Sequence, residues 1–126
     1  MSTLKVNTIQ DASGGSSSTA SDIASGRAKV WINFQGAGTI NIRDSFNVSS
    51  ITDNGTGDFT ISFSNAMSND DYCATGMCTY LMGEVPRYRI ISGYVWSTTS
   101  LRVITGYRDT FTADHHVDGV SIFGDQ

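Results

Sequence analysis

The sequence predicts an all-β protein: an antiparallel, jelly-roll-like β-sandwich preceded by an extended N-terminal arm. Two observations support this prediction. Apolar and polar residues alternate with a period of two over much of the chain after residue 27, which is the side-chain spacing of a half-buried strand. Turn-forming residues also recur about every ten residues, as in sandwiches and barrels, and no strand–helix–strand unit is visible. A chain of 126 residues suits one such domain.

The composition is low in charge and excludes some partners. Charged residues make up 16% of the chain and the formal net charge is -4, against about 25% charged residues in an average soluble domain. Lys and Arg are scattered, whereas a nucleic-acid-binding protein needs a basic face, so we expect no nucleic-acid partner. No apolar run approaches the roughly 18 residues of a membrane span. The N-terminus also lacks a signal-peptide pattern, so we expect synthesis in a cytoplasm and, if the protein ends up outside the cell, release by lysis rather than by secretion.

Residues 1–20 are predicted to form an arm and a linker, separate from a sandwich domain over residues 21–126. Residues 4–9 alternate like a short strand, and residues 11–19 read as a flexible Gly/Ser linker. A single strand is not stable alone. The arm is therefore expected to join a sheet of this chain or of a neighbour, and a frayed terminus is the alternative. The residues expected to anchor or oligomerise the protein are Leu4, Val6, Thr8 and Ile9.

The elements after the linker follow from the alternation. Residues 21–26 predict one helical turn with Ser21 as its cap and Gly26 as its stop. A hairpin is expected next, with its turn at residues 36–38 and Ala28, Val30, Ile32, Phe34, Ile40 and Ile42 along its strands. Further strands are expected over residues 46–51, 59–63, 72–81, 87–96, 101–105 and 117–123, with a polar loop over 106–116.

The clearest turn signal lies at residues 53–57, where the chain reads Asp-Asn-Gly-Thr-Gly. Asn-Gly readily adopts the positive φ that tight hairpin turns require. We therefore expect a hairpin here. Phe59, Ile61 and Phe63 should return on its core face, and Val120 and Ile122 are core candidates in the last strand.

The two cysteines, Cys73 and Cys78, are too few for a four-ligand zinc site. Their separation of five residues places them on opposite faces of one strand, where a disulfide has poor geometry. Cys73 is expected to be a small buried apolar residue.

The histidines and aspartates are the candidate metal ligands of this chain. His115 and His116, with Asp114 and Asp118, could bind a metal if a three-fold axis gathered three copies, but an exposed loop explains them better. The aspartates at 53, 58, 70 and 71 match no calcium-loop spacing and suit turns instead. We therefore predict no metal site and no cofactor.

An enzyme is not predicted. The chain carries no nucleophile elbow, phosphate-binding loop or dinucleotide fingerprint. Glycoside hydrolysis needs a converging pair of carboxylates, yet the acids fall mainly in turns and Glu84 is the only glutamate. A glycan hydrolase therefore ranks last among the functions considered.

Aromatic residues concentrate between Tyr80 and Tyr107. Such rings can stack on sugar faces, and they also serve for ordinary core and interface packing. If the protein has a ligand, this region is the expected recognition face. Its candidate residues are Tyr80, Arg87, Tyr88, Arg89, Tyr94, Trp96 and Tyr107.

Several stretches resemble small tail-fibre-like proteins of marine and cyanobacterial tailed phages. They are residues 2–10 with Ser13-Gly14-Gly15, residues 28–34, and the closing residues 120–124, and the most specific is Ile42–Asp58. The resemblance covers most of the chain and weakens between about Cys73 and Ser100.

The resemblance implies a trimeric, all-β virion component without an active site. Such a protein could be a tail fibre, a head fibre or a capsid-decorating knob on the virion surface. Its partners would be copies of itself and other capsid or tail proteins. The alternative is an adhesin whose aromatic-rich region binds a host-surface glycan.

Overall fold

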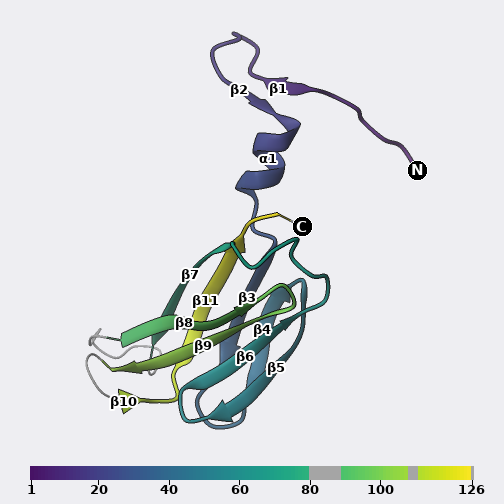
Figure 1. Ribbon diagram of the computed structural model, residues 1–126. Coiled ribbons are helices and arrows are strands. Elements are labelled where there is room, and N and C mark those ends of the chain that lie inside the picture. Colours follow the sequence, from purple (N-terminus) through teal and green to yellow (C-terminus); the bar gives the residue numbers. More distant parts are fainter. Residues whose placement is uncertain (80–88, 108–110, 126) are drawn as a thin grey trace.

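The computed structural model describes residues 1–79, 89–107 and 111–125 (Figure 1). Over these residues the protein is built of antiparallel strands and one short helix, which confirms the all-β prediction. The elements are β1 (Thr8–Gln10), β2 (Ser17–Thr19), α1 (Ala20–Gly26), β3 (Val30–Gln35), β4 (Asn41–Phe46), β5 (Val48–Gly55), β6 (Asp58–Phe63), β7 (Cys73–Thr79), β8 (Arg89–Ser97), β9 (Ser100–Tyr107), β10 (Phe111–Thr112) and β11 (His116–Phe123).

The strands form two large sheets and one small one. The four-stranded sheet has the order β4-β3-β11-β7. In the five-stranded sheet β5 pairs with β6 and β6 with β9, while β8 and β10 both pair with β9. β1 and β2 form the small sheet. The expected hairpin β3–β4 is present, as is a strand at each of the other expected places within the described residues.

One hydrophobic cluster joins the two large sheets. Phe34 of β3 and Phe59 of β6 meet edge to face, with ring centroids 5.2 Å apart. Fully burying a side chain of this size stabilises the fold by roughly 1.5–3 kcal/mol. The alternation predicted this core correctly, because the buried apolar residues include Val30, Ile32, Phe34, Phe59, Ile61, Phe63, Leu101, Val103, Val120 and Ile122.

Asn47 is the single residue between β4 and β5, and it carries the chain from one large sheet to the other. Its φ of 58° is left-handed, a conformation in which Asn is enriched. Its side-chain amide donates to the backbone oxygens of Lys29 and Asn65, and its Oδ1 accepts from the Asn65 N–H at 2.8 Å. The strand expected over residues 46–51 is therefore split, with Phe46 ending β4 and Val48 beginning β5.

The hairpin expected at residues 53–57 is present, but its turn is displaced. Gly55 pairs with Asp58, so Thr56 and Gly57 form the loop. Positive φ falls on Gly55 and Gly57 rather than on Asn54. The carboxylate of Asp53 accepts from the Gly55 N–H at 2.9 Å and fixes the approach to the turn.

The N-terminal segment, residues 1–27, differs from the expected arm and flexible linker. Part of that linker is strand β2, which pairs with β1 of the same chain. Helix α1 begins at Ala20 and its cap is Thr19 rather than Ser21, because Thr19 and Asp22 form a reciprocal capping box. Every residue of the segment is exposed, and Figure 1 shows it projecting away from the two large sheets. Among the described residues, no helix has the length and apolar character needed to span a membrane.

We expect Gly57→Ala to lower the free energy of unfolding by about 3 kcal/mol or more, because left-handed strain adds to a backbone collision. Gly57 has a φ of +66°, and a Cβ there would lie 2.4 Å from the Thr105 oxygen and 2.6 Å from the Ala113 nitrogen. Gly38→Ala is the control, since Gly38 has a φ of +74° but faces open space; its cost should be about 1 kcal/mol. Equal costs in urea unfolding would contradict the close approach.

Candidate functional site

The outward face of the five-stranded sheet carries the polar side chains of the candidate site. Asp58 and Thr60 alternate on β6 with the buried Phe59, and Arg102 on β9 lies between buried Leu101 and Val103. Successive side chains of a strand point to opposite faces. These three polar residues therefore project from the side opposite the core, where the register places Thr60 directly across from Arg102.

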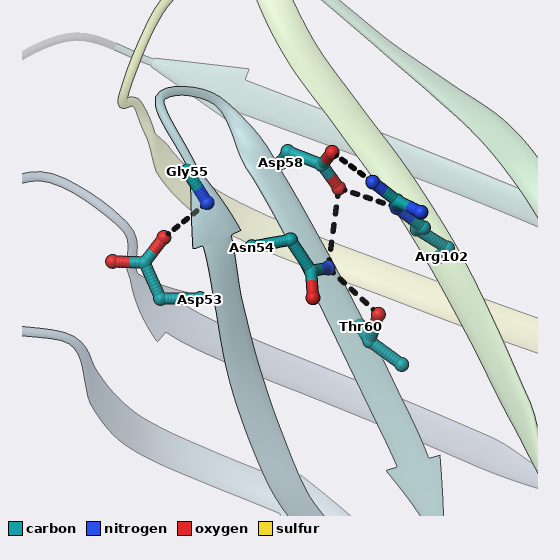
Figure 2. Close-up of polar contacts among 6 residues, drawn as sticks. All are labelled: Asp53, Asn54, Gly55, Asp58, Thr60 and Arg102. Atoms are coloured by element: carbon teal, nitrogen blue, oxygen red, sulfur yellow. Dashed lines mark hydrogen bonds and ion pairs between the residues drawn. The ribbon is translucent and has the colours of Figure 1, made fainter.

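An ion pair organises this face (Figure 2). The guanidinium of Arg102 donates twice to the Asp58 carboxylate, from Nε to Oδ1 at 2.7 Å and from a terminal nitrogen to Oδ2. Asn54 donates from Nδ2 to Asp58 at 3.2 Å and to Thr60 Oγ1 at 2.8 Å. Hydrogen bonding from Arg102 holds the pKa of Asp58 below its ordinary value, and partial burial opposes that shift. The result is a rigid two-pronged pair on the sheet surface.

Tyr94 adds an aromatic ring to the same face. On β8, Gly93 pairs with Val103 and Val95 pairs with Arg102, so Tyr94 is the extra residue of a β-bulge. The Arg102 guanidinium lies 5.3 Å from the centre of the Tyr94 ring, within cation–π range. The side chain is still 63% exposed. An aromatic platform held beside a charge pair can stack on a flat polar ligand while hydrogen-bonding its edge.

Trp96 plays a different part, although the sequence grouped it with Tyr94. It pairs with Leu101 on the core side of β8, and its ring lies 5.1 Å from that of Tyr72. A Cβ at Gly93 would stand 2.6 Å from the indole, so this glycine makes room for it. Tyr72 in turn donates its hydroxyl to the backbone oxygens of Ser97 and Ser100. Trp96 therefore packs against Tyr72 at the margin of the core and remains 39% exposed.

The structure does not describe the side chains of the other predicted recognition residues. Tyr80, Arg87 and Tyr88 lie outside the described residues, as do the side chains of Arg89 and Tyr107. Asp58 is part of this site rather than only the turn residue that the sequence predicts, and the sequence pattern does not predict Asn54 and Arg102 as its partners. One signal in the sequence could have found Asp58 and Arg102. Each alternates with the buried residues of its own strand, so its side chain points away from the core.

The histidine prediction was wrong. His115 and His116 were expected in an exposed loop, but they are only 0% and 9% exposed. His116 begins β11 and lies between Gln35 of β3 and Thr79 of β7. Gly36 lets the chain pass closely, since a Cβ there would be 2.4 Å from the His115 oxygen. The loop expected over residues 106–116 also contains the short strand β10.

The cysteine prediction was half right. Cys73 is exposed rather than buried, because it shares a face with Thr75 while Ala74 points to the core. Cys78 is the cysteine that packs against the core, and the two lie on opposite faces of β7 without forming a disulfide.

Carboxylates of the described residues serve local structure. Asp53 and Asp114 accept backbone N–H groups of Gly55 and Gly57, and Asp22 accepts from Thr19, whose hydrogen bonds lower the pKa of Asp22. Within the described part of the chain, no three His, Cys, Asp or Glu side chains come together as a metal site.

The predicted anchoring residues divide into two pairs. Thr8 and Ile9 lie in β1 opposite Thr19 and Ser18. Leu4 and Val6 precede β1 and are 84% and 41% exposed. Part of the arm therefore pairs with its own chain, through β1 and β2. The apolar residues at its front end, Leu4 and Val6, lie outside any strand.

Comparisons with protein-family models, with curated proteins and with solved structures find no match to this chain.

We expect the Asp58–Arg102 pair to stabilise the folded state only modestly, because the Arg102 side chain is partly exposed to solvent. Because the pKa of Asp58 is lowered in the folded state, this stabilisation is present above the ordinary value of 3.8 and is lost as pH falls below it. Asp58→Asn should therefore be less stable than the parent at pH 6, with the gap narrowing toward pH 2 in urea unfolding.

Arg102→Met and the double variant complete a double-mutant cycle that isolates the pair. The two single losses should not add in the double variant. Additive losses, or a gap that is constant with pH, would show that the carboxylate and guanidinium are not coupled.

Proposed function

We propose that this protein is a non-enzymatic structural component of a tailed-phage particle, an oligomeric appendage on the virion surface anchored through its N-terminal segment. The observation that carries the proposal is the contrast at residue 28. Every residue up to Arg27 is exposed, whereas Lys29 and Val30 are already buried. The exposed segment nevertheless holds several large apolar side chains, namely Met1, Leu4, Val6, Ile9 and Ile23.

A segment of this kind gains stability from a partner. Burial stabilises a protein by about 25 cal/mol per Å² of apolar surface removed from water. The exposed apolar side chains of this segment lack that stabilisation until a partner covers them. The β1–β2 hairpin has only three residues per strand, and a small isolated hairpin is marginal in water. Partners that supply the missing contacts are sister chains, as in a homotrimer, and other capsid or tail proteins. The proposal covers a tail fibre, a head fibre and a capsid-decorating knob.

The fold suits such a role. We propose that the two large sheets, which share one core, are the layers of a β-sandwich. The hairpins β3–β4, β5–β6 and β8–β9 each stay within one sheet. The proposed likeness to a jelly roll therefore lies only in the presence of two facing layers. A sandwich keeps its outward strands and loops available for contacts with a particle or a ligand.

A glycan-binding adhesin is the second candidate, and the Tyr94 face favours it. Exposed aromatic rings beside hydrogen-bonding groups suit sugars, whose faces are apolar and whose edges are hydroxyl groups. Tyr94 lies beside Arg102, which is itself hydrogen-bonded to Asp58. A glycan hydrolase ranks below both, because Asp58 is neutralised by Arg102 and Asp114 is held by the Gly57 N–H.

Deleting residues 2–10 is expected to abolish incorporation into particles while the β core stays folded, since the deleted residues contribute nothing to that core. Incorporation is measured in purified particles and folding by circular dichroism. Leu4→Ser/Val6→Ser is the matched variant, because it keeps the length of the segment and removes its apolar groups. Normal incorporation of the truncated protein would refute anchoring by this segment.

If the adhesin candidate holds, Tyr94→Ser should abolish binding to host-surface glycans on an array without unfolding the protein. Phe46→Ser is the control, because Phe46 is a similarly exposed ring, at 50%, on the other large sheet. The candidate fails if the parent protein binds no glycan, or if the Tyr94 and Phe46 variants bind alike.

A further inference from the structure

The four outer strands of the two large sheets are protected unequally. On β4 and β5, the edge strands carry the charged residues Arg43, Asp44 and Asp53 together with irregular register. On the other side, β7 has no charged residue, and β8 has only Arg89, at its first position, together with the bulge at Tyr94. Charges and bulges are how proteins prevent an edge from pairing with another strand. The edges β4, β5 and β8 thus carry such protection, whereas among the described residues the edge of β7 carries none.

A groove lies between β7 and β8, which do not pair as strands; the Cys78 thiol donates across it to the Ile90 backbone oxygen at 3.2 Å. Its volume is ≈ 320 Å³, and it is lined by Gly76, Met77, Cys78, Ile90 and Ile91. No lining residue is charged. Met77 is 71% and Ile90 49% exposed. Gly76 keeps the groove open, because a Cβ there would come within 3.2–3.3 Å of the Val120 and Ile91 side chains.

Strand β7 is suited to accept a further strand. All seven of its residues pair with β11 on one side, and its other side pairs with no described strand. Seven residues extend over roughly 23 Å, enough to bind a strand of four to seven residues. In such strand addition, main-chain hydrogen bonds supply affinity and alternate side chains fill the pockets.

We propose that the groove beside β7 receives residues 4–7 of a second copy of this chain. Leu4 and Val6 point to the same side of an extended strand, with Lys5 and Asn7 opposite. The first pair would fill the uncharged groove, and the second would face water. These residues precede β1 and belong to no strand of their own chain.

A second copy fits better than the same chain, because the N-terminal segment projects away from its own sheets (Figure 1). This inference rests on the proposed anchoring role of that segment, and it names the partner as a sister chain. Residues 4–7 of one chain would then bury Leu4 and Val6 in the groove beside β7 of the other chain.

The test is the solution mass of full-length variants by light scattering over a range of concentrations. Leu4→Asp/Val6→Asp alters the arm alone, and Met77→Lys/Ile90→Asp alters the groove alone. Ile23→Asp on α1 and Phe46→Asp on β4 are matched controls, since both residues are exposed apolar groups elsewhere. Met77→Lys alone serves if the double groove variant does not fold.

We expect the parent and both controls to self-associate and both test variants to be monomeric. Mixing the arm variant with the groove variant should restore a dimer, because each supplies the half that the other lacks. A monomeric parent, self-association that survives the groove substitutions, or a mixture that stays monomeric would each overturn the inference. If any of these three outcomes occurs and the Leu4→Asp/Val6→Asp variant still fails to enter particles, the proposed anchoring role stands. The partner of the segment is then another particle protein.

Discussion

The contact between Phe34 and Phe59 is the interaction on which the rest of the structure depends. It joins β3 of one large sheet to β6 of the other, with both rings fully buried. Neither sheet could bury its apolar face alone, so the shared core fixes which side of every strand faces outward. Asn47 and Gly57 serve this arrangement: the first turns the chain between sheets, and the second brings the β5–β6 turn against the Thr105 and Ala113 backbone.

Once the inner face is set, the outer surfaces acquire different properties. The outward residues of β6 and β9 form the Asp58–Arg102 pair beneath Tyr94, a polar face whose groups are mutually satisfied. The groove between β7 and β8 is lined by uncharged residues, and residues 4–7 alternate apolar Leu4 and Val6 with polar Lys5 and Asn7. We propose the first surface for a polar ligand and the other two for contact between copies of the chain. These contacts are the ones that the proposed role in assembly and recognition requires.

The core could be predicted from the sequence because alternation is a local signal. Val30, Ile32 and Phe34 follow a period of two, and any sheet that buries one must bury all three. The errors arose where burial depends on distant residues. His115 is polar and lies outside the strands, yet the absence of a side chain at Gly36 lets it be covered. Arg102 and Asp58 are 44 residues apart, and only strand register reveals that they meet.

A single core holds the strands of the two large sheets within the described residues after Arg27, and residues 1–27 lie outside it. Amide hydrogen exchange of the full chain at a concentration low enough for monomers tests it most directly. We expect slow exchange along β3, β6, β9 and β11, and at the Lys29 N–H, which precedes β3 and donates to the Ile122 oxygen. We expect fast exchange over residues 2–27. Protection of the N-terminal segment equal to that of β3 in the monomer would contradict it.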